Sequence, residues 1–147
     1  STCPNTPVAV AEGIIVCEDK HSLTGEEFQM VKDLFEKIAL VETVDTAHLS
    51  VAGTVCGCTP AYAAMFIEAL GDAGVKHGLT RAQAYRFAAQ MLVGTGKLHL
   101  ETGQHPGAMK DAVCSPGGTT IVGVASLERS GFRSAIIDAI DDVENKP

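Results

Sequence analysis

Residues 60–77 constrain the fold most strongly, because they predict a helix that is apolar around almost its whole circumference. Only Glu68, Asp72 and Lys76, spaced four residues apart, form one narrow polar stripe along it. Such a helix must be covered on most sides, since exposed apolar surface is unfavourable in water. It therefore belongs in a self-contained helical bundle or in an intertwined dimer, and periodicity alone leaves these two alternatives open.

Local signals place the ends of this helix. Thr59-Pro60 predicts an N-cap followed by proline at the first helical position, where its missing N–H does no harm. Gly78 suits a left-handed residue that ends the helix. Before it, Asp45 or Thr46 can cap a short helix that runs towards residue 55.

More helices are predicted after Gly78. Thr80 with Gln83 begins a helix that runs to about residue 100. Gly94 and Gly96 weaken its local propensity, so we expect close contact with another helix at that point. Three further helices are predicted: a short one that starts at His105-Pro106, one over residues 119–128 and one over residues 132–143.

The first 44 residues show a different pattern. Cys3-Pro4-Asn5-Thr6-Pro7 predicts a rigid connecting segment, because proline resists helix and sheet alike. Residues 13–17 and 40–44 are β-branched and predict strands. Between them, Thr24-Gly25-Glu26-Glu27 has capping-box spacing and begins a helix. The sequence therefore predicts a mainly α fold, with strand, helix and strand in residues 8–44 and helices in residues 45–147. The length fits one domain, or one domain with a fragment of another in residues 1–44.

Composition excludes several classes of protein. The 147 residues are 46% hydrophobic and 20% charged, which suits a folded domain. With 11 basic against 18 acidic residues, the net charge is -7, so nucleic-acid binding is not expected. Glycine and proline interrupt the uncharged stretches 49–67 and 112–127, so no membrane span is expected either. The first residues lack a signal peptide and the five cysteines suggest no disulfide framework, which together favour the cytoplasm.

The segment richest in chemistry is Ser115-Pro116-Gly117-Gly118-Thr119-Thr120. Two glycines directly before a helix leave backbone N–H groups bare, and the helix dipole adds partial positive charge there. The hydroxyls of Ser115, Thr119 and Thr120 add further donors. The segment suits a small anion, a carboxylate as well as a phosphate, and a plain glycine-rich helix connection is the structural alternative.

Other polar groups give weaker signals. One C-x-C at Cys56-Gly57-Cys58 makes no zinc site, and buried thiols are the better interpretation. The five histidines show no H-x-x-x-H spacing, and solvated stripes explain the acidic residues on the helices, so no metal site is predicted. The chain contains neither G-x-G-x-x-G nor a P-loop.

Taken together, a series of motifs along almost the whole chain resembles pyrroline-5-carboxylate reductase. The motifs that carry the resemblance are Pro4-Asn5-Thr6-Pro7, Pro60-Ala61-Tyr62, His105-Pro106-Gly107, Lys110-Asp111, Ser115-Pro116-Gly117-Gly118-Thr119-Thr120, Leu127-Glu128 and Gly131-Phe132-Arg133. The resemblance implies the last step of proline biosynthesis, the NADPH- or NADH-dependent reduction of 1-pyrroline-5-carboxylate to proline. It also implies a helical domain that interlocks with that of a second subunit in a homodimer, which in some members assembles further.

The resemblance also implies roles for particular residues. The loop containing Ser115, Gly117 and Gly118 would bind the substrate carboxylate, and Gly118 and Thr119 would offer it backbone N–H donors. Thr120 would hydrogen-bond at the ring nitrogen, as a proton donor or by orienting water, and is the candidate catalytic residue. At the other end of the chain, Pro4 and Asn5 would contact the cofactor.

Two departures from the family accompany the resemblance. Cys56-Gly57-Cys58-Thr59 stands where the family commonly has Ser-Gly-Ser-Gly, which changes the hydrogen bonds there. Under the resemblance, residues 1–44 are the end of a Rossmann domain whose nucleotide loop lies upstream, so this chain alone is expected to be inactive. A non-catalytic dimerisation or anion-binding module remains the alternative function.

Overall fold

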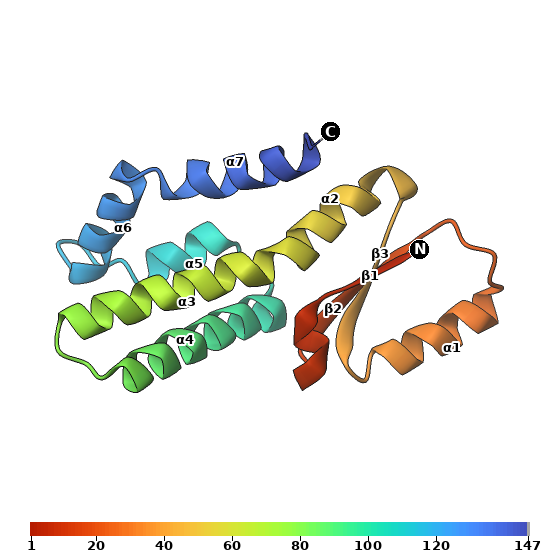
Figure 1. Cartoon of the computed structure of the whole chain (residues 1–147), viewed down its shortest axis with the longest axis horizontal. Coiled ribbons are helices and arrows are strands. Elements are labelled where there is room, and N and C mark those ends of the chain that lie inside the picture. Colours follow the sequence, from red (N-terminus) through yellow and green to blue (C-terminus); the bar gives the residue numbers. More distant parts are fainter. Residues whose placement is uncertain (147) are drawn as a thin grey trace. The chain divides into compact units, whose positions relative to one another are not determined.

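The computed structural model describes residues 1–146, which form two compact units. One unit contains residues 1–64 together with the last residues from 140 onward, and the other contains residues 65–139. Figure 1 shows the elements in chain order. They are β1 (Thr2–Pro4), η1 (Thr6–Val10), β2 (Gly13–Glu18), α1 (Gly25–Phe35), β3 (Ala39–Val44), η2 (Thr46–His48), α2 (Leu49–Gly53), η3 (Thr54–Cys58), α3 (Thr59–Lys76), α4 (Arg81–Thr102), α5 (Pro106–Ala112), α6 (Thr119–Arg129) and α7 (Phe132–Glu144).

The mainly α fold is confirmed, with a three-stranded sheet in the first unit. β2 lies in the middle, antiparallel to β1 and parallel to β3, and α1 forms the connection between the parallel pair. Ile15, Cys17, Ala39 and Val41 share one face of the sheet, where Phe28 and two further apolar residues complete a small core. The strand–helix–strand prediction is therefore confirmed.

β1 corrects the prediction for the first residues, which expected a rigid connection without strand structure. Thr2 pairs with Cys17 and Pro4 with Ile15 in an antiparallel ladder. Proline fits here because β1 is an edge strand, which pairs with a neighbour on one side only and can therefore lack an N–H. Pro7 lies in the following 3-10 helix η1.

The helical stretch Thr46–Lys76 runs without a break, which corrects the prediction of an N-cap at Thr59. Thr59 has helical backbone angles, φ -70° and ψ -16°, and its hydroxyl donates to the carbonyl oxygen of Val55 one turn earlier. The preceding turn, η3, is a π-helix. Pro60 cannot donate to the carbonyl of Cys56, and the side-chain amide of Asn5 donates to that oxygen instead, at 3.2 Å. The helix thus continues through the proline.

α3 and α4 form a hairpin in the second unit (Figure 1). A Cβ on Gly71 would lie 2.2 Å from the ring of Tyr85, and one on Gly74 would lie 2.8 Å from Cβ of Ala84. The close helix contact therefore occurs at these two glycines. The contact expected at Gly94 and Gly96 is not made within the described residues, since no other side chain comes within 4 Å of either position.

Caps and turns fix the remaining helices much as predicted. Gly78 takes the left-handed conformation, with φ +96°. His105 accepts a hydrogen bond from the N–H of Gly107 through Nδ1 at 3.0 Å, and so caps α5. Between α6 and α7, Gly131 has φ +74°, and the Arg133 Nε donates to Glu128 across the turn at 2.6 Å.

Much apolar surface of the single chain stays open. The side chains of Met65, Phe87 and Val122 are 67%, 60% and 66% exposed. The stretch Thr46–Lys76 is long and apolar enough to cross a membrane by length and composition, a test that the core helices of soluble proteins also pass. Within the described residues of one copy, the apolar faces of these helices therefore remain uncovered.

Candidate functional site

The loop between α5 and α6 is a tight turn that sequence and geometry explain together. The N–H of Gly118 donates to the carbonyl oxygen of Ser115 at 3.0 Å, which closes a four-residue turn. Pro116 occupies its second position and Gly117, with φ +70°, its third. This is the arrangement of a type II turn, which needs glycine at the third position because the φ is positive there.

Gly118 is fixed by a different constraint. Its own backbone is extended, with φ -75° and ψ 169°, so the conformation is open to other residues. A Cβ at this position would, however, lie 2.4 Å from the Ser115 hydroxyl oxygen. The turn thus packs the Ser115 hydroxyl against the residue that precedes α6, and any larger residue there would make this hydroxyl move.

The first turn of α6 supplies the donors of the candidate site. Thr119 and Thr120 are the first two residues of this helix, so their N–H groups have no partner within it. No side chain caps the helix at Gly118. The N–H of Gly118 is bonded to the Ser115 carbonyl within the turn, which corrects the expectation that it serves as a donor to the substrate. Both threonines are exposed, and the helix dipole favours negative charge at this end. The geometry suits a small carboxylate bound by backbone N–H groups and hydroxyls.

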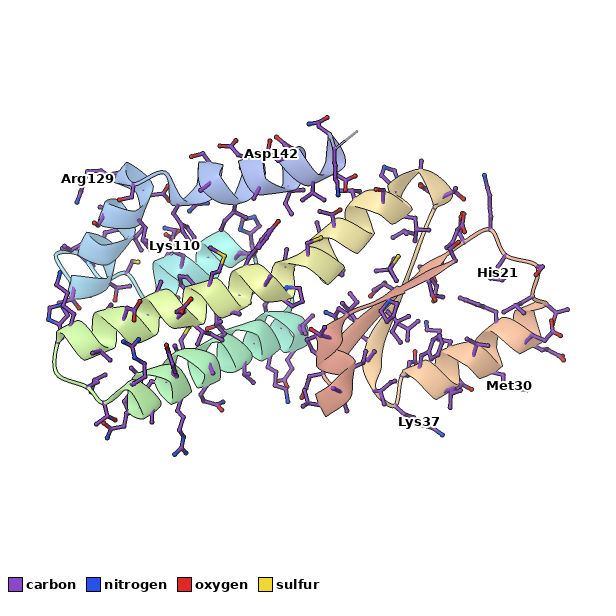
Figure 2. The ribbon with its side chains drawn as sticks, viewed as in Figure 1. His21, Met30, Lys37, Lys110, Arg129 and Asp142 are labelled. Carbon is purple, nitrogen blue, oxygen red and sulfur yellow. The ribbon has the colours of Figure 1, made fainter. Side chains whose placement is uncertain are left out.

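The nearby cation Lys110 is already engaged. Its ammonium group pairs with the neighbouring Asp111, and this contact is the main cause that raises the pKa of Lys110 above its ordinary value. Figure 2 shows Lys110 on α5, and Arg129 at the opposite end of α6 from the two threonines. Charge at the candidate site therefore comes mainly from the helix rather than from a free basic side chain.

A cavity of about 480 Å³ lies between the second half of α4 and α5. Its wall includes Leu98, His99, Met109 and Val113, so it is largely apolar. Residues 115–120 do not contribute to this wall. The cavity and the candidate anion site are therefore separate features of the second unit.

The predicted cofactor contacts, Pro4 and Asn5, belong to the first unit, whereas residues 115–120 belong to the second. The Asn5 side chain is used structurally: its Oδ1 accepts from the N–H of Ile14 at 2.9 Å, and its Nδ2 donates to the Cys56 carbonyl. Sequence reasoning missed this role. Its signal was Pro60, whose missing N–H leaves the carbonyl four residues earlier in need of a donor.

The other polar candidates are placed as follows. Asp72 pairs with Arg81 across the α3–α4 hairpin, so this member of the polar stripe is bound to another helix. Cys56 and Cys58 both lie half-buried in the π-helical turn η3, a type of turn that often occurs at functional sites. Within residues 1–146, no three His, Cys, Asp or Glu side chains converge as metal ligands.

Comparisons with known proteins match the chain to one family. Residues 46–146 match the family model for pyrroline-5-carboxylate reductase dimerisation. The chain is 51% identical over 140 residues to pyrroline-5-carboxylate reductase of Treponema pallidum, which covers 95% of this chain and 53% of that protein. For the Escherichia coli enzyme the identity is 47% over 137 residues, with 93% and 51% covered.

Solved structures give the same result. The 1-pyrroline-5-carboxylate reductase of Streptococcus pyogenes superposes with a TM-score of 0.89 at 30% identity, covering 99% of this chain and 56% of that one. The Plasmodium falciparum pyrroline carboxylate reductase with NADP bound gives a TM-score of 0.86 at 32% identity, covering 97% and 57%.

Fold and site define a mainly helical domain with a small sheet, a helix N-terminus with free backbone N–H groups and large open apolar faces. The sequence and structural matches make this class specific. The chain belongs to the pyrroline-5-carboxylate reductase family, and it spans about half the length of the curated relatives it matches.

Proposed function

We propose that this chain is the dimerisation and substrate-binding part of an enzyme that reduces 1-pyrroline-5-carboxylate to proline. The observation that carries the proposal is the type II turn of residues 115–118, which leads directly into the first turn of α6. It supports a carboxylate site made of backbone N–H groups, and the family match is the reason for proposing 1-pyrroline-5-carboxylate as the ligand.

Within this site each group has a proposed task. The N–H groups of Thr119 and Thr120 bind the substrate carboxylate, and the Ser115 hydroxyl helps to orient it. The Thr120 hydroxyl lies at the ring nitrogen, which gains a proton during the reduction, and either donates that proton or holds a water molecule that does. Gly117 and Gly118 contribute the turn itself. Positioning of the ring is the main contribution of these residues to the rate.

NADPH or NADH would supply the hydride to the C=N carbon, as is implied for the family, and the solved Plasmodium falciparum relative carries NADP. The described residues fit such a dinucleotide poorly, because the sequence has no G-x-G-x-x-G and the Asn5 amide is bonded to Ile14 and Cys56. We therefore assign the main cofactor site to residues outside these 147. Pro4 and Asn5 remain the predicted contacts within them.

The proposal includes a homodimer in which the open helical faces cover one another. The apolar exposure of α4 and α6 supports it, as does the match to a dimerisation family model. A cytoplasmic location is part of the same proposal, with a small-molecule substrate rather than nucleic acid or membrane as the partner. The net charge of -7 supports the exclusion of nucleic acid.

A binding experiment with L-proline, the product, tests the substrate site. We expect Thr120→Val to lower the affinity by about tenfold, because one hydrogen bond to a charged ligand is lost. Ser126→Ala, which removes a hydroxyl further along α6, serves as the matched control and should bind like the unmodified chain. Equal affinity of the Thr120→Val variant would exclude Thr120 from the site, and isothermal titration calorimetry measures both variants.

A further inference from the structure

Two cysteines that are far apart in the sequence, Cys3 and Cys56, lie in contacting elements of the first unit. β1 contacts the π-helical turn η3, so Cys3 lies near the turn that contains Cys56. The Sγ of Cys3 lies 3.5 Å from the position that a Cβ on Gly53 would occupy. Gly53 precedes Cys56 by three residues, which is less than one helical turn. Because Gly53 has no side chain, the Cys3 sulfur has space to turn towards Cys56.

Asn5 gives a second, independent observation of the same proximity. Cys3 and Asn5 are two residues apart along extended backbone, and alternate side chains of such a segment lie on the same side. The Asn5 Nδ2 donates to the carbonyl oxygen of Cys56 at 3.2 Å. The side of the segment that carries Cys3 therefore faces the turn at Cys56, and Asn5 holds the two backbones together.

The state of the two thiols is also informative. Both are free and half-buried. Burial raises the pKa of the Cys56 thiol, and the neighbouring Cys3 raises it further. A raised pKa lowers the thiolate fraction of Cys56, which suits a thiol that reacts second rather than first.

We propose that Cys3 and Cys56 form a reversible disulfide when the chain meets hydrogen peroxide. The Cys3 thiolate attacks one peroxide oxygen, the O–O bond breaks, and the leaving hydroxide takes up a proton to become water. The Cys56 sulfur then attacks the sulfenic acid on Cys3, so the S–S bond forms and a second water leaves. Two thiols together lose two electrons, and one peroxide gains them.

The remaining cysteines are placed less well for this reaction. Cys17 is buried in the core on β2, 2% exposed, and Cys114 belongs to the other compact unit. Cys58 lies in the same turn as Cys56 and is the natural competitor. The bond between Cys3 and Cys56 would tie β1 covalently to the turn that precedes Pro60, beside the hydrogen bond from Asn5 to the Cys56 carbonyl.

Peptide mapping of the intact, purified chain after peroxide treatment tests the proposal. We expect one pair of thiols to be lost and the peptides containing Cys3 and Cys56 to be joined within one chain. Dithiothreitol should separate them again. The midpoint of thermal unfolding should rise by roughly 5 °C on oxidation, because the bond closes a long loop in the unfolded chain.

Matched variants complete the experiment. Cys3→Ser and Cys56→Ser should each abolish the link and the rise in melting temperature, whereas Cys58→Ser and Cys114→Ser should keep both. Circular dichroism of each reduced variant verifies that it is folded. A link between Cys56 and Cys58, a link between two chains, or oxidation of Cys3 without any link to Cys56 would each overturn the proposal.

Discussion

At the scale of single residues, the molecule depends on side chains that satisfy backbone groups elsewhere in the chain. Asn5 is the main example, because it accepts from the N–H of Ile14 and donates to the carbonyl of Cys56, which Pro60 leaves without its helical donor. The identity of Asn5 is therefore explained by contacts outside its own segment.

We expect Asn5→Ala to lower the free energy of unfolding by about 2 kcal/mol, because two hydrogen bonds are lost and a partly buried carbonyl is left without a donor. Urea unfolding followed by circular dichroism measures this change. Asn145→Ala, an exposed position at the end of the chain, is the matched control and should change the free energy by less than about 0.5 kcal/mol. Equal stability of the Asn5→Ala variant would show that the amide is dispensable.

The sequence predicted some of these residue roles and not others. The importance of residues 115–120 followed from local chemistry, because glycine, proline and threonine define a turn and a helix start wherever they occur together. The role of Asn5 depends on Cys56, 51 residues further along the chain. No local pattern contains such a contact, so a cofactor role was predicted for Asn5 and remains a prediction.

At the scale of elements, helix starts were the most predictable feature. Thr24 with Glu27, and Thr80 with Gln83, form the two capping boxes that the spacing indicated. Both depend only on residues three apart, so the sequence contains all the information needed. β1 was not predicted, because an edge strand exists only through its pairing with β2. The π-helical turn η3 was not predicted either, because Thr59-Pro60 indicated the start of a new helix rather than the continuation of one.

The first capping box gives a prediction about pH. Hydrogen bonds from the Thr24 backbone N–H, and next from its hydroxyl, hold the pKa of the Glu27 carboxyl below its ordinary value. Because the pKa is lowered in the folded chain, the ionised cap stabilises the fold fully at pH values above the ordinary glutamate pKa of about 4.3. This stabilisation is lost as the pH falls through the lowered pKa. NMR titration should show this lowered pKa, and Thr24→Ala, which removes the hydroxyl but keeps the backbone N–H, should return it part of the way to the ordinary value. An unchanged pKa in the variant contradicts the assignment.

The α3–α4 hairpin gives a prediction about packing. Gly71→Ala should lower the free energy of unfolding by about 1–3 kcal/mol, because the added methyl meets the Tyr85 ring and the space cannot open without cost. Gly25→Ala is the control, since nothing lies within 4 Å of a Cβ there. Chemical denaturation compares the two. A stability equal to that of the control would mean that the hairpin adjusts freely.

At the scale of the whole molecule, the open apolar faces are the main feature. Phe87 and Met91 lie four residues apart on α4 and are 60% and 43% exposed, so they form part of one open face. The sequence predicted that the apolar helix faces are buried, either in a self-contained bundle or in a dimer. It did not choose between the two, because periodicity shows that a face is apolar but not what packs against it. One copy of the chain does not supply that cover, which supports the proposed dimer.

Phe87→Lys should weaken the proposed dimer by at least about tenfold in dissociation constant, because a large apolar side chain is replaced by a charge at the contact. Analytical ultracentrifugation over a range of concentrations measures it. Ala82→Lys, on the other side of α4, adds the same charge and should leave the dimer intact. A monomeric unmodified chain would contradict the proposed assembly itself.

The most direct test of the central claim is an NMR titration of the isotope-labelled chain with L-proline. The central claim is that the turn of residues 115–118 and the start of α6 bind the carboxylate of the substrate. The amide signals of Gly118, Thr119 and Thr120 should then shift most, and in proportion to the bound fraction. Shifts confined to other parts of the chain, or no shift at any amide, would contradict the account.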